Sequence, residues 1–589
     1  MTTTKNNNNI VTIDSSESIP EKPVKKFRWR VVDDTSPKEI YNMVLYTSAL
    51  VFGILGAARG MDEGTVSGNL YQQSFRNLFG LNDPNKDEHQ IADLKSNIAA
   101  MVQLGSVGGS ILAMYTVDKL GRVRALQEVC VLWIVGAVIQ ITSRSIGQLY
   151  AGRLLEGFAI GQTTTIGPTY MSEVAPPAYR GLFGCLFSGA VYFGIFVSYA
   201  TNYATAKHIS GTSHSQWMIP ISLKIIMAGL VLIGTFFSNE SPRWLLKVGQ
   251  NDRALKNLCK LRQLPPDHPY IVGEINDINE QVLVEKEALN GYTWYHKFKD
   301  ILTVKSIRYR FFMIGAMSQL LGQWSGANAI TIYAADLFSF AGITGVEVMK
   351  MTVILGVVKF CSAYFSAFFI IDFMGRRKAL YIGIIIQMLA ILFFGIFLQI
   401  VPHATIKGSI LSPSERAASR AAMAALYISG IGWTMGFNSV QYLLGSEIFP
   451  LKLRSFGQSL IMVLHFANQY GNSKAVPKML LTLSKYGAFY FFVGVCAMAL
   501  FWSWFFIPEI SGRSLESMEE VFNLPWYLVG RRGAVMCPDH SEINKVTHGE
   551  ISSIHYNEDG FDKNKATGEH IEDASNRRNS DDEKDAKYR

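Results

Sequence analysis

The sequence predicts an all-α integral membrane protein of twelve helices, arranged as two six-helix halves with a helical cytoplasmic loop between them. Three observations predict this fold. Only 17% of the 589 residues are charged, whereas a soluble protein usually carries about a quarter. The apolar residues gather into twelve runs, each near the ~20 residues that span the hydrocarbon of a bilayer. Charged motifs also recur at corresponding places in the two halves.

The twelve apolar runs follow one another with one long polar interval in the middle. They lie near 41–68, 94–117, 125–143, 148–172, 181–204, 217–237, 311–338, 347–371, 379–401, 420–446, 455–475 and 486–507. The expected parts are an amino-terminal tail (1–39), a six-helix bundle (40–238), a helical loop (239–308), a second six-helix bundle (309–508) and a carboxy-terminal tail (509–589). Both tails have the composition of disordered segments. Because no apolar stretch precedes residue 40, no cleavable signal peptide is expected.

The loops on one side of the expected bilayer are rich in basic residues. These are Lys119, Arg122, Arg124, Arg180, Arg376, Arg377, Lys378, Lys452 and Arg454. By the positive-inside rule this side is cytoplasmic, and an even number of spans places both termini there. These loops explain the net charge of +8, because no soluble segment carries the basic, aromatic-rich stripe of a nucleic-acid partner. We expect a multi-pass protein of the plasma membrane.

The loop motifs of the first half are repeated in the second. Asp118–Arg124 follows the second run and Asp372–Arg377 follows the eighth, while Glu173–Arg180 follows the fourth and Glu447–Arg454 follows the tenth. One such loop would be explained by charges that anchor helix ends, but matched pairs in parallel six-helix repeats indicate a transporter. The residues expected to gate its cytoplasmic end are Asp118, Gly121, Arg122, Glu173, Arg180, Asp372, Gly375, Arg376, Glu447 and Arg454.

These motifs resemble those of the sugar porter family of the major facilitator superfamily over roughly residues 40–525. Asn239–Trp244 is similar to the family's motif after the sixth helix, which adds Glu240 and Arg243 to the expected gate, and Pro508–Glu516 is similar to the motif after the twelfth. The stretches that look most like fungal quinate-permease-type members are Glu173–Arg180, Leu261–Tyr270 and Gly342–Lys359. The resemblance implies the major facilitator fold, alternating access and a central site for quinate, monosaccharides or sugar acids.

Asp62 in the first run and Arg153 in the fourth are charges inside expected spans. Each costs roughly 3 kcal/mol or more unless paired, so we expect both to face the bundle interior. The resemblance implies that they are the aspartate and arginine of proton-coupled members. Pairing with arginine favours the charged carboxylate, whereas separation in apolar surroundings favours the protonated one, which would couple protons to movement. The alternative is that Asp62 pairs locally with Arg59, one helical turn earlier.

Three of the other charges inside the runs are given expected roles. Glu63 and Glu156 are expected to be structural, either pairing near the cytoplasmic motifs or lining the cavity. Lys224, in the sixth run, is expected to extend its ammonium toward the outer interface while its stem stays in the apolar layer.

Amides and aromatic rings in the second half, together with one serine of the fifth run, are candidates for binding a hydroxylated substrate, because amides both donate and accept hydrogen bonds and rings stack on sugars. The candidates are Ser188, Gln319, Gln323, Asn328, Tyr333, Tyr442, His465 and Phe466. Gln323, Asn328 and Tyr333 fit the family's pattern, whereas Ser188, Tyr442, His465 and Phe466 replace residues typical of the family. His465 could bind a carboxylate when protonated, or act as a neutral hydrogen-bonding group. Amides in membrane helices also hold helices together.

The sequence therefore predicts proton-coupled uptake of a monosaccharide or a related polyol or sugar acid, with no cofactor and no metal. The alternatives are a nutrient receptor without net transport and a passive facilitator. An enzyme is not expected, because the sequence lacks a phosphate-binding loop, metal-ligand spacing and a nucleophile elbow. The six cysteines show no paired spacing. The expected partners are the substrate, protons and lipid, and we expect a monomer.

Overall fold

The structure is a computed structural model of the whole chain. It describes residues 37–176, 180–289, 293–370, 374–406, 412–438, 441, 448–450, 453–508, 522, 529 and 530. The chain divides into two compact units, Met1–Val535 and Met536–Arg589, and every described residue lies in the first. The expected site residues outside the described part are Asp372, Tyr442 and Glu447, together with the side chains of Arg180 and Arg454.

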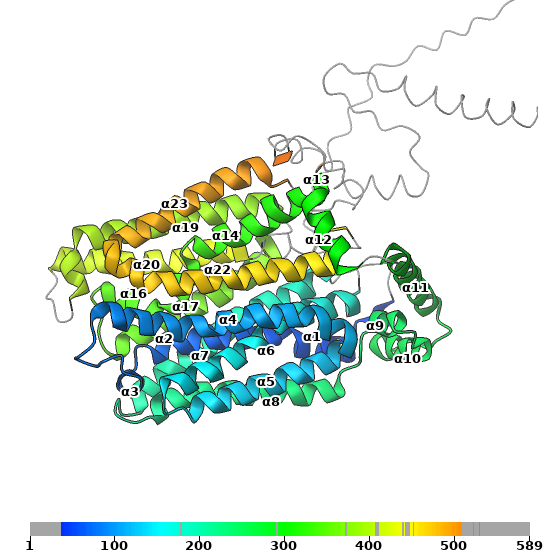
Figure 1. Cartoon of the computed structure of the whole chain (residues 1–589), viewed down its shortest axis with the longest axis horizontal. Helices are drawn as coiled ribbons and strands as arrows, with labels where there is room; N and C mark the ends of the chain where they lie inside the picture. Colours follow the sequence, from blue (N-terminus) through cyan, green and yellow to red (C-terminus); the bar gives the residue numbers. More distant parts are fainter. Residues whose placement is uncertain are drawn as a thin grey trace, which may run out of the picture. The chain divides into compact units, whose positions relative to one another are not determined.

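The amino-terminal half is a bundle of six membrane-length helical segments (Figure 1). The first segment is α1 (Met43–Gly53), which α2 (Leu55–Asn69) continues after a single residue. The others are α4 (Glu88–Leu120), α5 (Arg122–Ile141), α6 (Ile146–Val174), α7 (Arg180–His208) and α8 (Ser215–Phe237). Two short elements, η1 (Lys38–Ile40) and α3 (Gln73–Leu78), flank the first segment.

Glycines let α2 lie directly against α7. Gly60 and Gly64 lie on the face of α2 that contacts α7, and a Cβ atom at Gly64 would come within 2.7 Å of Ser198 Cβ. Small residues at this spacing allow two membrane helices to approach backbone to backbone. Asp62 lies two residues from each glycine, which is about half a helical turn, so it points to the other side of α2.

Five helices of between 4 and 21 residues lie between the two halves in the described residues 239–289 and 293–308. They are α9 (Pro242–Lys247), α10 (Asn251–Arg262), α11 (Pro269–Leu289), α12 (Trp294–Thr303) and α13 (Lys305–Arg308). Figure 1 shows α9, α10 and α11 together beyond one end of the bundle. Arg262 attaches them to α6, because its guanidinium bonds both oxygens of Glu274 at 2.9 and 2.6 Å and the carbonyl of Val174 at 3.1 Å.

The carboxy-terminal half also has six segments. They are formed by η3 (Tyr309–Ala316) with α14 (Met317–Trp324), α15 (Ala327–Ile332) and α16 (Ala334–Phe340); α17 (Val346–Phe365) with η4 (Ser366–Ile370); α19 (Arg376–Ile400); α20 (Pro413–Trp433) with η6 (Thr434–Asn438); α22 (Arg454–Thr482); and α23 (Ser484–Phe506). The short element η5 (Pro402–Thr405) follows α19. Gly326 interrupts the seventh segment with a φ of +91°, a conformation that only glycine adopts easily.

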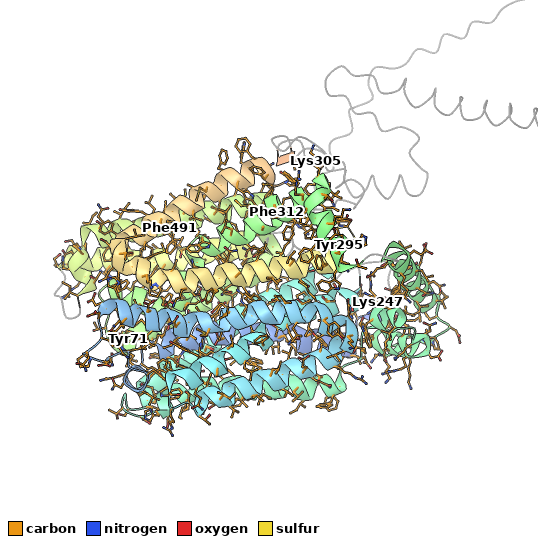
Figure 2. All side chains as sticks on the ribbon, in the orientation of Figure 1. Tyr71, Lys247, Tyr295, Lys305, Phe312 and Phe491 are labelled. Carbon is orange, nitrogen blue, oxygen red and sulfur yellow. The ribbon has the colours of Figure 1, made fainter. Side chains whose placement is uncertain are left out.

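Twelve helical segments in two halves, with no strand in the described ranges, confirm the predicted fold class. Seven of the helices in these ranges are long and apolar enough to cross a membrane by length and composition alone. Large apolar side chains also face outward, among them Phe312 and Phe491, which are 38% and 42% exposed (Figure 2). A hydrocarbon layer would cover this surface.

The two ends of the bundle differ. We call the end with Asp118, Glu173 and Glu240 the motif end, and the end with Lys95 and Asp336 the opposite end. In Figure 2 Lys247 marks the motif end of the first half and Tyr71 the opposite end.

Candidate functional site

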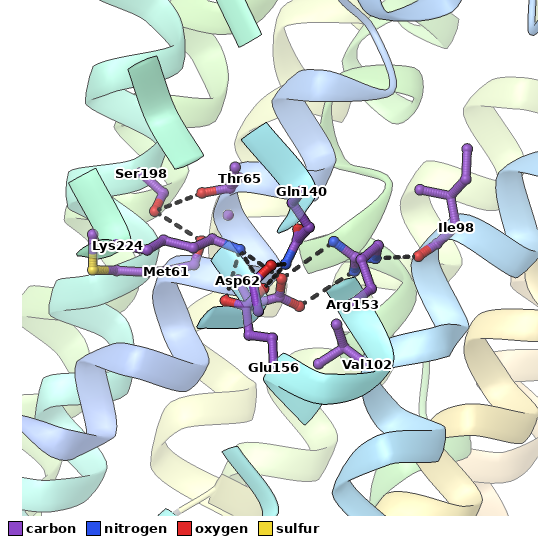
Figure 3. Close-up of polar contacts among 12 residues, drawn as sticks. Met61, Asp62, Thr65, Ile98, Val102, Gln140, Arg153, Glu156, Ser198 and Lys224 are labelled. Carbon is purple, nitrogen blue, oxygen red and sulfur yellow. Dashed lines mark hydrogen bonds and ion pairs between the residues drawn. The ribbon is translucent and has the colours of Figure 1, made fainter. Parts of the chain in front are cut away.

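Four ionisable side chains meet inside the amino-terminal bundle, and we call them the charge cluster (Figure 3). Asp62 comes from α2, Arg153 and Glu156 from α6, and Lys224 from α8, and each is at most 3% exposed. The Arg153 guanidinium lies 3.3 Å from Asp62. The Lys224 ammonium lies 2.9 Å from Asp62 and 3.0 Å from Glu156. Two acids therefore balance two bases in the buried interior of the bundle.

The cluster corrects two interpretations of the sequence. Asp62 does not pair with Arg59, because Arg59 binds Glu63 at 3.1 Å instead. The expectation that Lys224 reaches the outer interface is wrong, since its side chain is fully buried between two carboxylates. Ion pairing with good geometry compensates the loss of water. The position of Lys224 along α8 could not reveal this, because its partners come from other helices.

Neutral groups hold the cluster in place. Glu156 accepts hydrogen bonds from Trp133 Nε1 at 2.9 Å and from the Gln140 amide. Arg153 Nε donates to the carbonyl oxygen of Ile98 at 2.6 Å. Glu156 was expected either to pair near the loop motifs or to line the cavity, and it does neither, because its partners are Lys224, Trp133 and Gln140 inside the bundle.

A cavity lies between the two halves. Its lining residues from the first half are Arg59, Glu63, Val191, Tyr192 and Ile195. Those from the second half are Gln323, Ala327, Asn328, Thr331, Trp433, Asn438, Gln441 and His465. We call it the central cavity.

The structure places three of the expected substrate residues on the central cavity, namely Gln323, Asn328 and His465. Gln319 lies behind them, with its Oε1 atom 2.7 Å from His465 Nδ1. Tyr333 is buried and donates to a backbone carbonyl at 2.8 Å, so its hydroxyl already has a structural partner.

The remaining two described candidates do not belong to this lining. Phe466 packs beneath the Arg59 guanidinium, 5.5 Å from ring centre to cation, and so supports a lining residue from behind. Ser188 lies on α7 one helical turn before Tyr192, and it is partly buried.

Sequence reasoning missed several polar residues at the cavity. Gln469 of α22 donates to Glu63 at 2.8 Å and to Asn328 at 3.1 Å, and it accepts from Arg59 at 3.3 Å. Its spacing of four residues from His465 would have placed it on the same helix face. Trp433 Nε1 donates to the Tyr192 hydroxyl at 2.7 Å and so joins the two halves, but nothing in its local sequence predicts that contact.

The motif end contains the predicted gate residues of the first half. The Arg122 guanidinium binds both oxygens of Glu173, at 2.7 and 2.9 Å, and lies 3.5 Å from Asp118. Glu240 accepts from the backbone N–H groups of Arg122 and Val123 at 2.9 and 3.1 Å, and so caps the amino terminus of α5. Burial raises the pKa of Glu240, while these hydrogen bonds act against the shift.

Two glycines at equivalent places in the halves adopt equivalent conformations. Gly121 precedes α5 with a φ of +92°, and Gly375 precedes α19 with a φ of +83°. A Cβ atom on Gly121 would lie 2.7 Å from Glu240 Oε2, so glycine also leaves room for the cap. In the loop, Arg243 lies 3.5 Å from Glu285, and Arg376 is the first residue of α19.

A second cavity, of about 590 Å³, lies at the motif end between α4, α6, α12 and α22. Asp118, Arg122, Trp294, Lys297 and Phe456 are among its lining residues. At the opposite end, ion pairs join the halves instead: Lys95 lies 3.2 Å from Asp336, and Asp93 lies 2.8 Å from Lys478.

Two matched six-helix halves around a buried polar cavity define a membrane transporter of the major facilitator class. The family described as "Sugar (and other) transporter" matches residues 48–522, and the chain belongs to this family. A probable quinate permease of Neosartorya fischeri is 32% identical over 84% of this chain and 90% of the relative. The quinate permease of Neurospora africana is 31% identical over 83% of this chain and 91% of the relative. The resemblance to permeases of this type, rather than to enzymes, is thereby confirmed.

The fold is also that of solved transporters. The proton:xylose symporter XylE bound to 6-bromo-6-deoxy-D-glucose superposes with a TM-score of 0.66 at 20% identity, over 82% of this chain and 99% of that one. The inward-open form of the xylose transporter XylE from E. coli gives a TM-score of 0.64 at 21% identity, over 81% and 99%.

Proposed function

We propose that this transporter takes up a monosaccharide, or a related polyol or sugar acid, together with a proton by alternating access. The observation that carries the proposal is the placement of Asp62 and Glu63. These consecutive residues of α2 face different sites, because Asp62 enters the charge cluster and Glu63 lines the central cavity. A single helix therefore connects a protonatable group with the substrate site.

Protonation of Asp62 would change the forces on α2. The neutral acid loses its ionic attraction to Arg153 and Lys224, and Lys224 keeps Glu156 as its partner at 3.0 Å. The helix is then less strongly held to α6 and α8. Movement of α2 would shift Glu63, which contacts Gln469 of the other half at 2.8 Å. This gives a direct route from proton binding to rearrangement of the cavity.

The central cavity offers the groups that a hydroxylated ligand needs. Gln323 and Asn328 supply donors and acceptors, and Trp433 supplies an aromatic face. The Oε1 atom of Gln441 is buried and has no hydrogen-bond partner among the described residues, although its Nε2 atom donates to a carbonyl at 2.7 Å. A substrate hydroxyl would satisfy this acceptor, since unpaired buried polar atoms are costly.

The arrangement of the two ends favours a state that is closed at the opposite end. The ion pairs Lys95–Asp336 and Asp93–Lys478 hold the halves together there, while a cavity lies at the motif end. By loop charge, the motif end and both termini face the cytoplasm, and the plasma membrane is the proposed location. We propose a monomeric carrier.

The test is uptake of labelled glucose, xylose, quinate and galacturonate in cells that lack their own transporters, with and without a protonophore. We expect concentrative uptake of at least one of these, abolished by the protonophore and by Asp62→Asn. The matched control is Asp277→Asn, which removes an exposed carboxylate of α11. Uptake that survives both treatments would instead favour a passive facilitator. Signalling without uptake of any of the four would favour a nutrient receptor.

A further inference from the structure

A second buried lysine lies next to the central cavity. Lys359 of α17 is 1% exposed, and its ammonium donates to the Thr331 hydroxyl, with 2.5 Å between Nζ and Oγ1. Thr331 is a lining residue of the cavity. Lysine is almost never fully buried unless it is paired, so this position requires an explanation.

The Lys359 ammonium is held beside Thr331, a residue of the cavity wall. Gly430 of α20 leaves space for the lysine stem, because a Cβ atom there would lie 3.1 Å from Lys359 Cγ and 3.2 Å from Cε. The Thr331 hydroxyl donates its own hydrogen to the carbonyl oxygen of Ala327 at 2.9 Å, so its oxygen is available to accept from the ammonium. An ammonium has three donors, and Thr331 accounts for one of them.

The charges around the central cavity do not balance. Glu63 is the one carboxylate among the described lining residues, and Arg59 already neutralises it at 3.1 Å. Within the described part of the chain, Lys359 forms no ion pair with an acid, although Glu63 is near enough to act on it electrostatically. The charge cluster, in contrast, pairs two acids with two bases. A ligand anion would supply the missing negative charge at the cavity.

We propose that Lys359, acting beside Thr331, recognises a carboxylate on the substrate, so that the cavity takes a hydroxylated monocarboxylate in preference to a neutral sugar. The inference rests on the proposed function and narrows its substrate class. The lysine would contribute a charge-assisted hydrogen bond, and the lining amides would bind the hydroxyl groups. Gln323 and Asn328 alone would not distinguish the acid from the neutral sugar.

A consequence for charge movement follows. One proton and one monoanion that cross together carry no net charge, whereas a proton with a neutral sugar carries one positive charge. Transport of the acid should therefore respond to the pH gradient but not to the membrane potential.

The first experiment compares galacturonate with galactose, which differ by the carboxylate, in uptake by the full chain. We expect Lys359→Met to reduce galacturonate uptake at low concentration by about tenfold or more, the usual effect of losing a charge-assisted hydrogen bond, and to reduce galactose uptake by a much smaller factor. Lys359→Arg should retain part of the galacturonate uptake. The matched control is Lys350→Met on the same helix, where the lysine side chain is 50% exposed. Equal losses for both sugars would overturn the inference.

The second experiment needs no variant. In liposomes that contain the wild-type protein, quinate and galacturonate uptake is driven by a pH gradient while valinomycin and potassium set the membrane potential. Uptake that does not change with potential supports the inference, and potential-driven uptake of these acids overturns it. If the wild type moves galactose but neither acid, the inference fails while the proposed function stands. If the wild type moves none of galactose, quinate, galacturonate, glucose and xylose, the inference and the proposed function both fail.

Discussion

Lys224 offers a sharp test of the charge cluster, because it is the base shared by both acids. Lys224→Met removes contacts of 2.9 Å to Asp62 and 3.0 Å to Glu156 at a fully buried position. The cluster would then hold two carboxylates but only one cation, Arg153, which contacts Asp62 and leaves Glu156 without its cation. Breaking a buried ion pair by removing one partner usually costs about 3–5 kcal/mol, because the other charge stays buried and uncompensated.

The double variant Lys224→Met/Glu156→Gln removes one base and one acid together. It restores the balance of charge and leaves Asp62 paired with Arg153 at 3.3 Å. Glutamine can still accept the hydrogen bond that Trp133 donates to Glu156 at 2.9 Å. We therefore expect the double variant to recover most of the stability lost in the single variant, with a coupling energy of about 1–3 kcal/mol.

The assay is thermal unfolding of purified protein in one detergent at fixed concentration, together with the amount of protein at the cell surface. The expected order of melting temperature is wild type, then the double variant, then Lys224→Met. A wild-type melting temperature for Lys224→Met would refute the buried pairing. A double variant whose loss equals the sum of the two single losses would refute the coupling between Lys224 and Glu156.

Two further predictions concern the ends of the bundle. Gly121→Ala should lower the melting temperature and the surface expression, because a φ of +92° strains any residue with a side chain and the new Cβ atom would lie 2.7 Å from Glu240 Oε2. The control is Gly229→Ala, inside α8 with open space around it, which should be neutral or stabilising. Asp336→Asn should weaken the 3.2 Å contact with Lys95 and so favour opening at the opposite end. Opening is measured as faster thiol labelling of Asn328→Cys in a variant without other cysteines. An unchanged labelling rate would contradict the proposed closure.

Much of the architecture could be predicted because its causes are local. The length of an apolar run is set by the thickness of the bilayer, so twelve runs predicted twelve spans. The glycines Gly121 and Gly375 marked equivalent turns in the two halves, and both adopt a positive φ. Asp62 and Arg153 were expected to face the interior because an isolated charge in a span is costly, and the structure brings them within 3.3 Å of each other.

Partners within the interior could not be predicted in this way. Asp62 and Glu63 are neighbours in sequence, yet successive helical residues are rotated by about 100°, so they face different sites. Which acid receives Arg59 depends on what α6, α8 and α22 present to each face of α2. The local alternative, Asp62 with Arg59, had suitable spacing but the wrong face.

The two buried lysines show which features follow from the sequence and which depend on the tertiary structure. By itself, the sequence determined that Lys224 and Lys359 lie inside membrane-spanning runs, because composition and run length alone set this. Only the tertiary structure decided that Lys224 lies between two acids whereas Lys359 lies beside Thr331 at a cavity. The energy of a buried charge depends on groups that other helices bring to within a few ångströms, and a linear sequence does not contain those distances.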